Sequence, residues 1–152
     1  MCEQQFIIDD NVIESALTGF DVSGAQENTC FMLLGLIMNN RQHRIILSGH
    51  MRRKYARIFS RLQSQRLVRN DLMASMLPLY ISTRERMLDL NDRQHINARL
   101  TDCENILVIL AQDVNGSVIV TQNSDLNPKV QNLHQRPLID TPIDAIRRAQ
   151  TD

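Results

Sequence analysis

The chain has 152 residues, of which 43% are hydrophobic, and its 17 basic residues balance its 17 acidic residues. This composition predicts a single globular domain over residues 1–152 and excludes a collagen-like, disulfide-rich or disordered chain. The longest apolar run, residues 30–38, is too short for a helix that crosses a bilayer, which needs about 20 residues. The N-terminal residues also lack the pattern of a secretory signal. We therefore expect a cytoplasmic protein with no membrane partner.

Charge is distributed unevenly along the chain. Residues 1–27 contain six acidic and no basic residues, whereas residues 28–70 contain nine basic and no acidic residues. Of the 17 basic residues 15 are arginines, whose planar guanidinium suits bidentate contacts with phosphate. Such a segment either binds an anionic partner or forms a solvated helix surface that pairs with acidic residues elsewhere in the fold.

The first elements are a short strand and a helix. The apolar run 6–8 predicts the strand, and it ends abruptly at Asp9, Asp10 and Asn11. These three side chains can cap a following helix over residues 12–17.

A buried helix, a second strand and a basic helix follow. Residues 25–38 predict a helix that is apolar on nearly all sides and therefore buried. Residues 44–47 predict a buried strand, and Ser48 is a candidate N-cap for a helix over residues 49–65. Apolar residues recur on one face of this helix at the spacing of a core-facing stripe.

The other face of this helix carries the candidate nucleic-acid site. Arg53, Arg57 and Arg61 lie four residues apart and therefore share one face, with Arg52 and Lys54 beside them. We predict that these five residues bind RNA.

The second half of the chain alternates in the same way. Residues 70–97 are weakly helical and give no clear pattern, but Thr101 and Glu104 fit a capping box that begins a helix ending near residue 115. An apolar strand is predicted at residues 117–121 and a shorter one at residues 137–139, before a final helix up to residue 148. This alternation predicts an α/β fold with a mostly parallel central sheet of four or five strands flanked by helices.

Acidic and amide side chains follow the predicted strands. Asp9 follows the first strand and Asn123 and Asp125 follow the third, while Asp102 begins the helix that leads into that third strand. Because the carboxyl ends of parallel strands share one edge of a sheet, Asp9, Asp102 and Asp125 are the candidate ligands of one Mg²⁺ or Mn²⁺ ion. Each of these acids taken alone can equally be explained as a helix cap or a turn residue.

The chain resembles the PIN domain family. The segment Ile7-Ile8-Asp9-Asp10-Asn11-Val12-Ile13 is similar to the family's opening strand, and residues 118–126 (VIVTQNSDL) are similar to its strand that ends in Thr and two acidic positions. The segments 44–48, 102–111 and 139–142 follow in the family's order, so the resemblance covers most of the chain.

This resemblance implies a three-layer fold and a Mg²⁺- or Mn²⁺-dependent endoribonuclease, often the toxin of a toxin–antitoxin pair and a homodimer. It implies catalytic and metal-binding roles for Asp9, Asp102 and Asp125, with Asn123 as a further metal ligand. The implied supporting residues are Asp10, Asn11, Glu104 and Thr121. Two positions depart from the family pattern, because Lys54 and Asn123 stand where carboxylates are expected. Hydrolysis is therefore expected to be weak or absent, since fewer carboxylates attract the ion less strongly.

Two alternatives compete with this hypothesis. A response-regulator receiver domain also has acidic residues after its first strand, but it needs an Asp in the middle of the chain, and residues 28–70 contain none. The remaining alternative is an inactive module that binds RNA or a protein through its arginine face. The three cysteines, Cys2, Cys30 and Cys103, have no metal-ligand spacing and are predicted to behave as small buried apolar residues.

Overall fold

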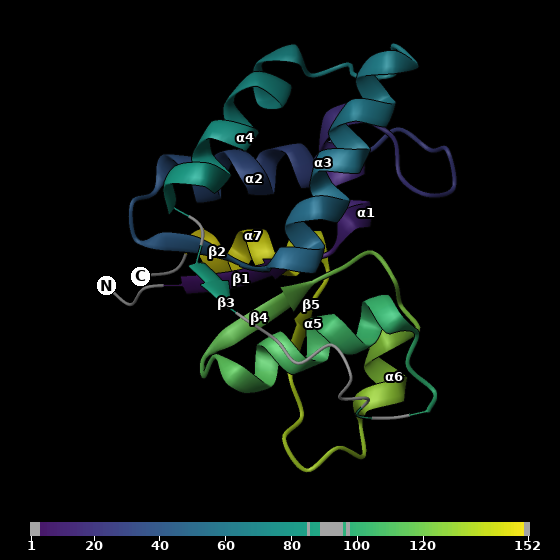
Figure 1. Cartoon of the computed structure of the whole chain (residues 1–152), viewed down its shortest axis with the longest axis vertical. Coiled ribbons are helices and arrows are strands. Elements are labelled where there is room, and N and C mark those ends of the chain that lie inside the picture. Colours follow the sequence, from purple (N-terminus) through teal and green to yellow (C-terminus); the bar gives the residue numbers. More distant parts are fainter. Residues whose placement is uncertain (1–3, 85, 89–95, 97, 151–152) are drawn as a thin grey trace.

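The computed structural model describes residues 4–84, 86–88, 96 and 98–150. Within these residues the chain forms five strands and seven helices, with one or two helices after each strand (Figure 1). In chain order they are β1 (Gln4–Ile8), α1 (Asp10–Thr18), α2 (Thr29–Asn39), β2 (His43–Ser48), α3 (Gly49–Ser64), α4 (Asp71–Arg84), β3 (Arg86–Leu88), α5 (Asp102–Asp113), β4 (Ser117–Val120), α6 (Leu126–Val130), β5 (Leu138–Asp140) and α7 (Pro142–Gln150).

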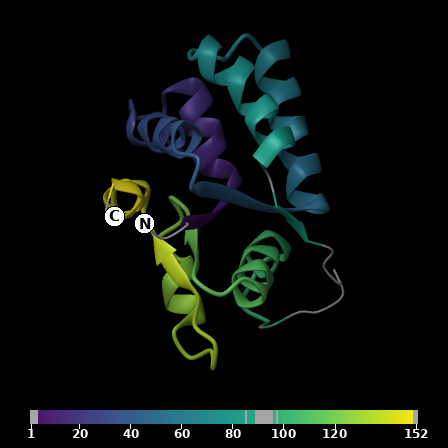
Figure 2. The same ribbon diagram turned by 90° about the vertical axis from the view of Figure 1, so that its left-hand side faces the viewer.

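All five strands form one parallel sheet in the order β3-β2-β1-β4-β5. Phe6 in β1 lies opposite Ile45 of β2 on one side and Val118 of β4 on the other. Helices α1 to α4 lie on one side of the sheet and α5 and α6 on the other, while α7 packs against α2 (Figures 1 and 2). The predicted α/β fold with a parallel, helix-flanked sheet is confirmed.

The central strands β1 and β4 are buried at their apolar positions on both faces of the sheet, which explains their uninterrupted apolar runs. The side chains of Phe6, Ile7 and Ile8 are completely inaccessible to solvent, as are those of Ile119 and Val120. Parallel strands covered by helices on both faces need continuous apolar runs rather than alternation.

Local capping signals located the starts of α3 and α5 correctly, whereas α1 begins at Asp10 rather than at residue 12. Asp9 caps α1 by accepting a hydrogen bond from the backbone N–H of Asp10, and Ser48 caps α3 through the N–H of Met51. Thr101 and Glu104 form the predicted capping box at the start of α5. These bonds satisfy backbone donors that have no partner inside the helix.

The prediction for α2 was partly wrong. The helix begins at Thr29 rather than near residue 25, because the preceding residues form a hydrogen-bonded loop and the Glu27 carboxylate accepts from the N–H groups of Thr29 and Cys30. It is also not buried on nearly all sides, since Phe31 and Met32 are exposed. Apolar composition alone does not reveal which face of such a helix meets the core.

Residues 70–97, which gave no clear pattern, contain α4 and β3. Helix α4 continues through Pro78, and β3 pairs with β2 at the edge of the sheet. The short helix α6 was also missed. Residues 85, 89–95 and 97 of this segment lie outside the described residues.

The cysteines differ from the prediction. Cys30 is buried as expected, but Cys103 is exposed, and Cys2 lies outside the described residues. Among the helices that the structure describes, none combines the length and the hydrophobicity needed to cross a membrane.

Candidate functional site: a charge-paired cleft and an arginine stripe

The candidate site lies where the direction of winding reverses. From β1 the chain proceeds to β2 and β3 on one side, whereas β4 and β5 lie on the other side of β1. In open parallel sheets, ligands bind at the carboxyl ends of the strands that flank such a reversal. Asp9 directly follows β1 and Thr121 directly follows β4.

An open cleft of about 580 Å³ lies at this edge. It is lined by Asp9 and its neighbours after β1, by the first turn of α5, by residues that follow β4, and by Lys54 and Lys129. Lys54 and Lys129 are the only two lysines of the chain. The cleft is therefore polar, with groups of both charges.

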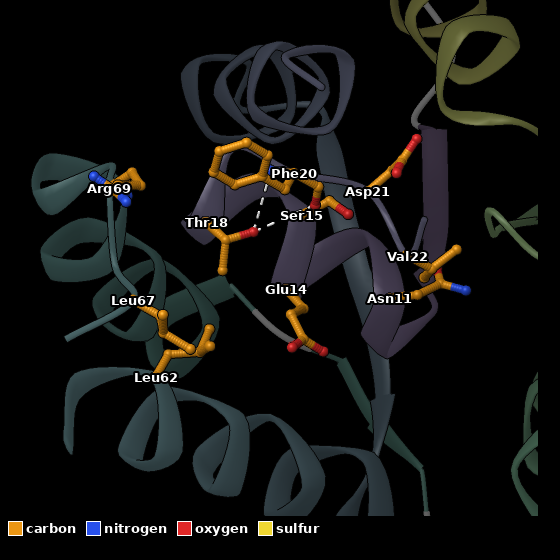
Figure 3. A pocket seen from close by; sticks show the side chains of 10 residues that line it. All are labelled: Asn11, Glu14, Ser15, Thr18, Phe20, Asp21, Val22, Leu62, Leu67 and Arg69. Atoms are coloured by element: carbon orange, nitrogen blue, oxygen red, sulfur yellow. Dashed lines mark hydrogen bonds between the residues drawn. The ribbon is translucent and has the colours of Figure 1, made fainter. Parts of the chain in front are cut away.

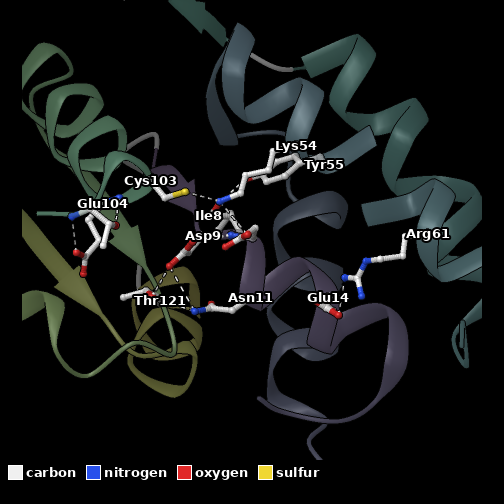
Figure 4. Close-up of polar contacts among 12 residues, drawn as sticks. Ile8, Asp9, Asn11, Glu14, Lys54, Tyr55, Arg61, Cys103, Glu104 and Thr121 are labelled. Atoms are coloured by element: carbon white, nitrogen blue, oxygen red, sulfur yellow. Dashed lines mark hydrogen bonds and ion pairs between the residues drawn. The ribbon is translucent and has the colours of Figure 1, made fainter. Parts of the chain in front are cut away.

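Asp9 is held at the centre of this edge by three hydrogen bonds. Its Oδ1 accepts from the backbone N–H of Asp10 at 2.8 Å, and its Oδ2 accepts from the Thr121 hydroxyl at 2.7 Å and from Asn11 Nδ2 at 3.4 Å (Figure 4). The backbone N–H of Asp9 also donates to the carbonyl of Val120 at 2.9 Å. Asp9 thus connects the ends of β1 and β4.

The pKa values of Asp9 and Asp10 shift in opposite directions. Burial and, next, the hydrogen bond to the Asp10 side chain raise the pKa of Asp9 to about 7, against the lowering effect of the Thr121 hydroxyl. Burial also pushes the pKa of Asp10 upward, but the bond with Asp9 and the Lys54 ammonium outweigh it and leave that pKa below its ordinary value. A protonated Asp9 beside an ionised Asp10 offers one negative charge where two were expected.

Lys54 occupies the cleft rather than the exposed surface of α3. Its Nζ lies 3.0 Å from the Asp10 carboxylate and donates to Cys103 Sγ at 2.9 Å (Figure 4). Burial alone lowers the pKa of Lys54, but the contacts with Cys103 and Asp10 outweigh it and raise the pKa above its ordinary value. Lys54 is therefore a charged ammonium that neutralises Asp10.

Lys129 plays the same part for Glu104. Its Nζ lies 2.9 and 3.2 Å from the two carboxylate oxygens of Glu104, which also accepts from Asn123 Nδ2 at 3.0 Å. Burial opposes ionisation of Glu104, but the N–H of Thr101 and the Lys129 ammonium outweigh it and hold the pKa of Glu104 below its ordinary value. Each ionised acid that lines the cleft thus has an ammonium partner.

Of the three acids predicted as metal ligands, only Asp9 lies in the cleft. Asp9, Asp10, Asn11, Glu104 and Asn123 all line the cleft, and Thr121 contacts Asp9. By contrast, the predicted ligands Asp102 and Asp125 are exposed and are not among the residues that line it. Asn123 Oδ1 accepts from the N–H of Asp125 at 3.0 Å, so it holds the turn after β4.

Capping geometry explains why Glu104 lies in the cleft instead of Asp102. Glu104 is the third residue of α5, and its carboxylate reaches back to the N–H of Thr101 at 2.9 Å. Asp102, the first residue of the helix, remains exposed. The capping-box pattern identified Glu104 as a cap, and the family resemblance implied it only as a supporting residue of the site. Lys129 was missed, and its one signal in the sequence is that lysine is rare in this chain.

The carboxylates of the cleft, as they are arranged, do not fit a divalent metal ion. Among the described residues, no three Asp, Glu, His or Cys side chains form a group that could hold a metal. Within the part of the chain that the structure describes, three carboxyl groups line the cleft. With a pKa of about 7, Asp9 is partly protonated near neutral pH, and Asp10 and Glu104 have lysine ammonium partners at 3.0 and 2.9 Å. An ion would have to displace a proton and two lysines to gain the oxygen ligands that it needs.

The remaining predicted basic residues form an exposed surface, which we call the arginine stripe: Arg53, Arg57 and Arg61 of α3. All three are exposed, as is Arg52 beside them. Arg61 pairs with Glu14 of α1 at 2.7 Å. Arg53 and Arg57 have no hydrogen bond or ion pair with any residue that the structure describes, so their charges face solvent.

Comparison with known proteins adds no family to this geometry: no family model, no curated protein and no solved structure gives a significant match.

Proposed function

We propose that this chain is a PIN-like RNA-binding domain whose metal-dependent hydrolysis is weak or absent. One observation carries the proposal. The two lysines neutralise Asp10 and Glu104 in the cleft, whereas Arg53 and Arg57 present charge that no described residue compensates. A neutralised cleft attracts a divalent cation weakly, and an uncompensated arginine stripe attracts phosphate.

RNA binding through the stripe predicts a steep dependence on salt. Each phosphate that an arginine neutralises releases counterions, so affinity falls as salt increases. Fluorescence anisotropy with a labelled single-stranded RNA, measured over a range of salt concentrations, tests this dependence. For the double variant Arg53→Ala and Arg57→Ala, we expect weaker binding and a log–log salt slope that is smaller by about 1.4.

A matched control is the double variant Arg136→Ala and Arg147→Ala. Both arginines are exposed, one in the segment before β5 and one in α7, and their loss changes the net charge by the same amount. We expect this control to keep most of the affinity and the original slope. If the two double variants behave alike, RNA responds only to net charge and the stripe is ordinary solvated surface.

The second candidate is a working endoribonuclease, which the shared cleft of Asp9 and Glu104 favours. Structured RNA incubated with Mn²⁺ and either the wild-type protein or Asp9→Asn separates the two functions. We expect no difference between the two proteins. Robust cleavage that disappears in Asp9→Asn would establish the enzyme and overturn the inactive-domain proposal. An antitoxin partner and a homodimer, which the PIN resemblance also implies, stay predictions.

A further inference from the structure

A second pocket lies beside the cleft and is not used by the function proposed above. It has a volume of about 430 Å³ and lies between α1, the loop that follows it and the end of α3 (Figure 3). Phe20 forms one wall, and Leu62 and Leu67 form the apolar side opposite (Figure 3). Most of the other lining residues are polar, among them the acids Glu14 and Asp21 and the base Arg69. Pockets of this size with apolar walls and a few polar groups are typical of sites for small organic moieties.

The pocket adjoins the cleft. Asn11 and Val22 line both of them. Helix α3 also connects the two, because Lys54 lies in the cleft and Leu62, eight residues further along the same helix, lies in the pocket. Eight helical residues span about 12 Å, which is a short step along an extended single strand.

The arginine stripe leads into this pocket. Arg61, the last residue of the stripe, pairs with Glu14, which lines the pocket. Arg57 lies one turn earlier on the same face of α3. A nucleic-acid backbone that follows the stripe therefore passes the mouth of the pocket, where the exposed Arg69 adds a further positive charge.

Phe20 is exposed but held in place. Its side chain is 43% exposed, and its N–H donates to the Thr18 hydroxyl at 3.2 Å. Its backbone forms an antiparallel bridge with Gln26. The Asp21 carboxylate closes the same loop by accepting from the N–H groups of Ser23 at 2.9 Å and Ala25 at 3.0 Å. A ligand that stacks on Phe20 thus needs little additional ordering of the loop.

We propose that this pocket holds a nucleobase of single-stranded RNA, stacked on the ring of Phe20, while the adjoining phosphates lie along the arginine stripe. The inference rests on the proposed RNA binding and deepens it. A basic track beside an ordered, exposed aromatic ring is the arrangement by which proteins bind single strands without reading a duplex. A peptide could contact the apolar walls of the pocket but would not need the arginine stripe.

The test compares Phe20→Ala with Phe31→Ala in the same anisotropy assay. Phe31 is the matched control, because it is 37% exposed on α2 and lines neither the pocket nor the cleft. We expect Phe20→Ala to weaken RNA binding about fivefold or more, as the loss of one stacked base does, with an unchanged salt slope. Phe31→Ala should bind as the wild type does, and Phe20→Tyr should keep most of the affinity because it keeps the ring.

Inorganic polyphosphate, which has charge but no bases, separates stacking from a general effect on the loop. Phe20→Ala should bind polyphosphate as tightly as the wild type. Equal weakening of RNA and polyphosphate would overturn the nucleobase site, because Phe20 would then act only through loop structure. Equal RNA affinity of Phe20→Ala and Phe31→Ala would also overturn it while leaving the RNA-binding proposal intact. Absence of salt-dependent RNA binding by the wild type would overturn both.

Discussion

The cleft and the arginine stripe are both rich in charge, but they differ in how that charge is paired. In the cleft, Lys54 and Lys129 each lie about one hydrogen-bond length from a carboxylate. On the stripe, Arg53 and Arg57 face solvent without a described partner, and only Arg61 is paired. Charges that are paired within the fold contribute to stability, whereas unpaired exposed charges remain available to a ligand. The same basic segment of sequence supplies both Lys54 and the stripe.

The largest expected effect on stability comes from replacing Glu104, because this breaks its ion pair with Lys129 in the cleft. Glu104→Ala removes a buried carboxylate that holds Lys129, Thr101 and Asn123, so we expect the free energy of unfolding to fall by about 3 kcal/mol. Urea denaturation measures this change. Its control is Asp102→Ala, which removes an exposed acid from the same helix turn and should lower stability by less than about 1 kcal/mol. Equal losses would contradict the assignment of Glu104 to the cleft.

The next effect concerns the proton on Asp9. The pKa of Asp9 is about 7 in the folded protein and near 3.8 in an unfolded chain, so the folded state binds more protons between these values. Its contribution to stability is complete below about pH 4 and is lost as the pH rises through 7. Asp9→Asn, which cannot ionise, should therefore gain stability relative to the wild type as the pH rises from about 4 to about 8.

Thermal unfolding of the wild type and Asp9→Asn at several pH values measures this gain. A stability difference that does not change with pH would show that Asp9 is ionised throughout. The exposed acid Asp125 provides the control, because Asp125→Asn should show no such trend.

A smaller effect is expected from a variant that tests whether Lys54 prevents metal binding. Lys54→Glu together with Asn123→Asp removes one ammonium and adds two carboxylates beside Asp9 and Asp10. We expect Mn²⁺ to stabilise this variant by about 1.4 kcal/mol at a concentration tenfold above its dissociation constant. The wild type should show no comparable shift in melting temperature. If Mn²⁺ stabilises both proteins equally, Lys54 does not exclude the ion.

The smallest effect concerns the paired end of the stripe. Arg61 and Glu14 form an ion pair whose side chains are 46% and 40% exposed. Water and salt screen such a pair, so Arg61→Ala should lower the free energy of unfolding by no more than about 0.5 kcal/mol. Urea denaturation measures the loss. A larger value would mean that the pair contributes substantially to the contact between α1 and α3.

The sequence by itself determined the elements that depend on local interactions. Strand β1 and the caps at Asp9, Ser48 and Thr101 were predicted because an apolar run, or a side chain within three residues of its backbone partner, is a local signal. The same holds for the exposed face of α3, which follows from helical spacing. By contrast, α4 was not recognised, because Pro78 and a weak apolar pattern conceal it.

Only the tertiary structure decided which side chains meet. Lys54 and Cys103 are separated by 49 residues and Asn11 and Thr121 by 110, yet their side chains are in contact because β1 lies between β2 and β4. No local pattern encodes that order of strands. The position of Glu104 rather than Asp102 in the cleft depends on how α3, α5 and α6 are arranged around one edge of the sheet. The same arrangement brings Lys54 to Asp10 and Lys129 to Glu104, which the sequence alone does not predict.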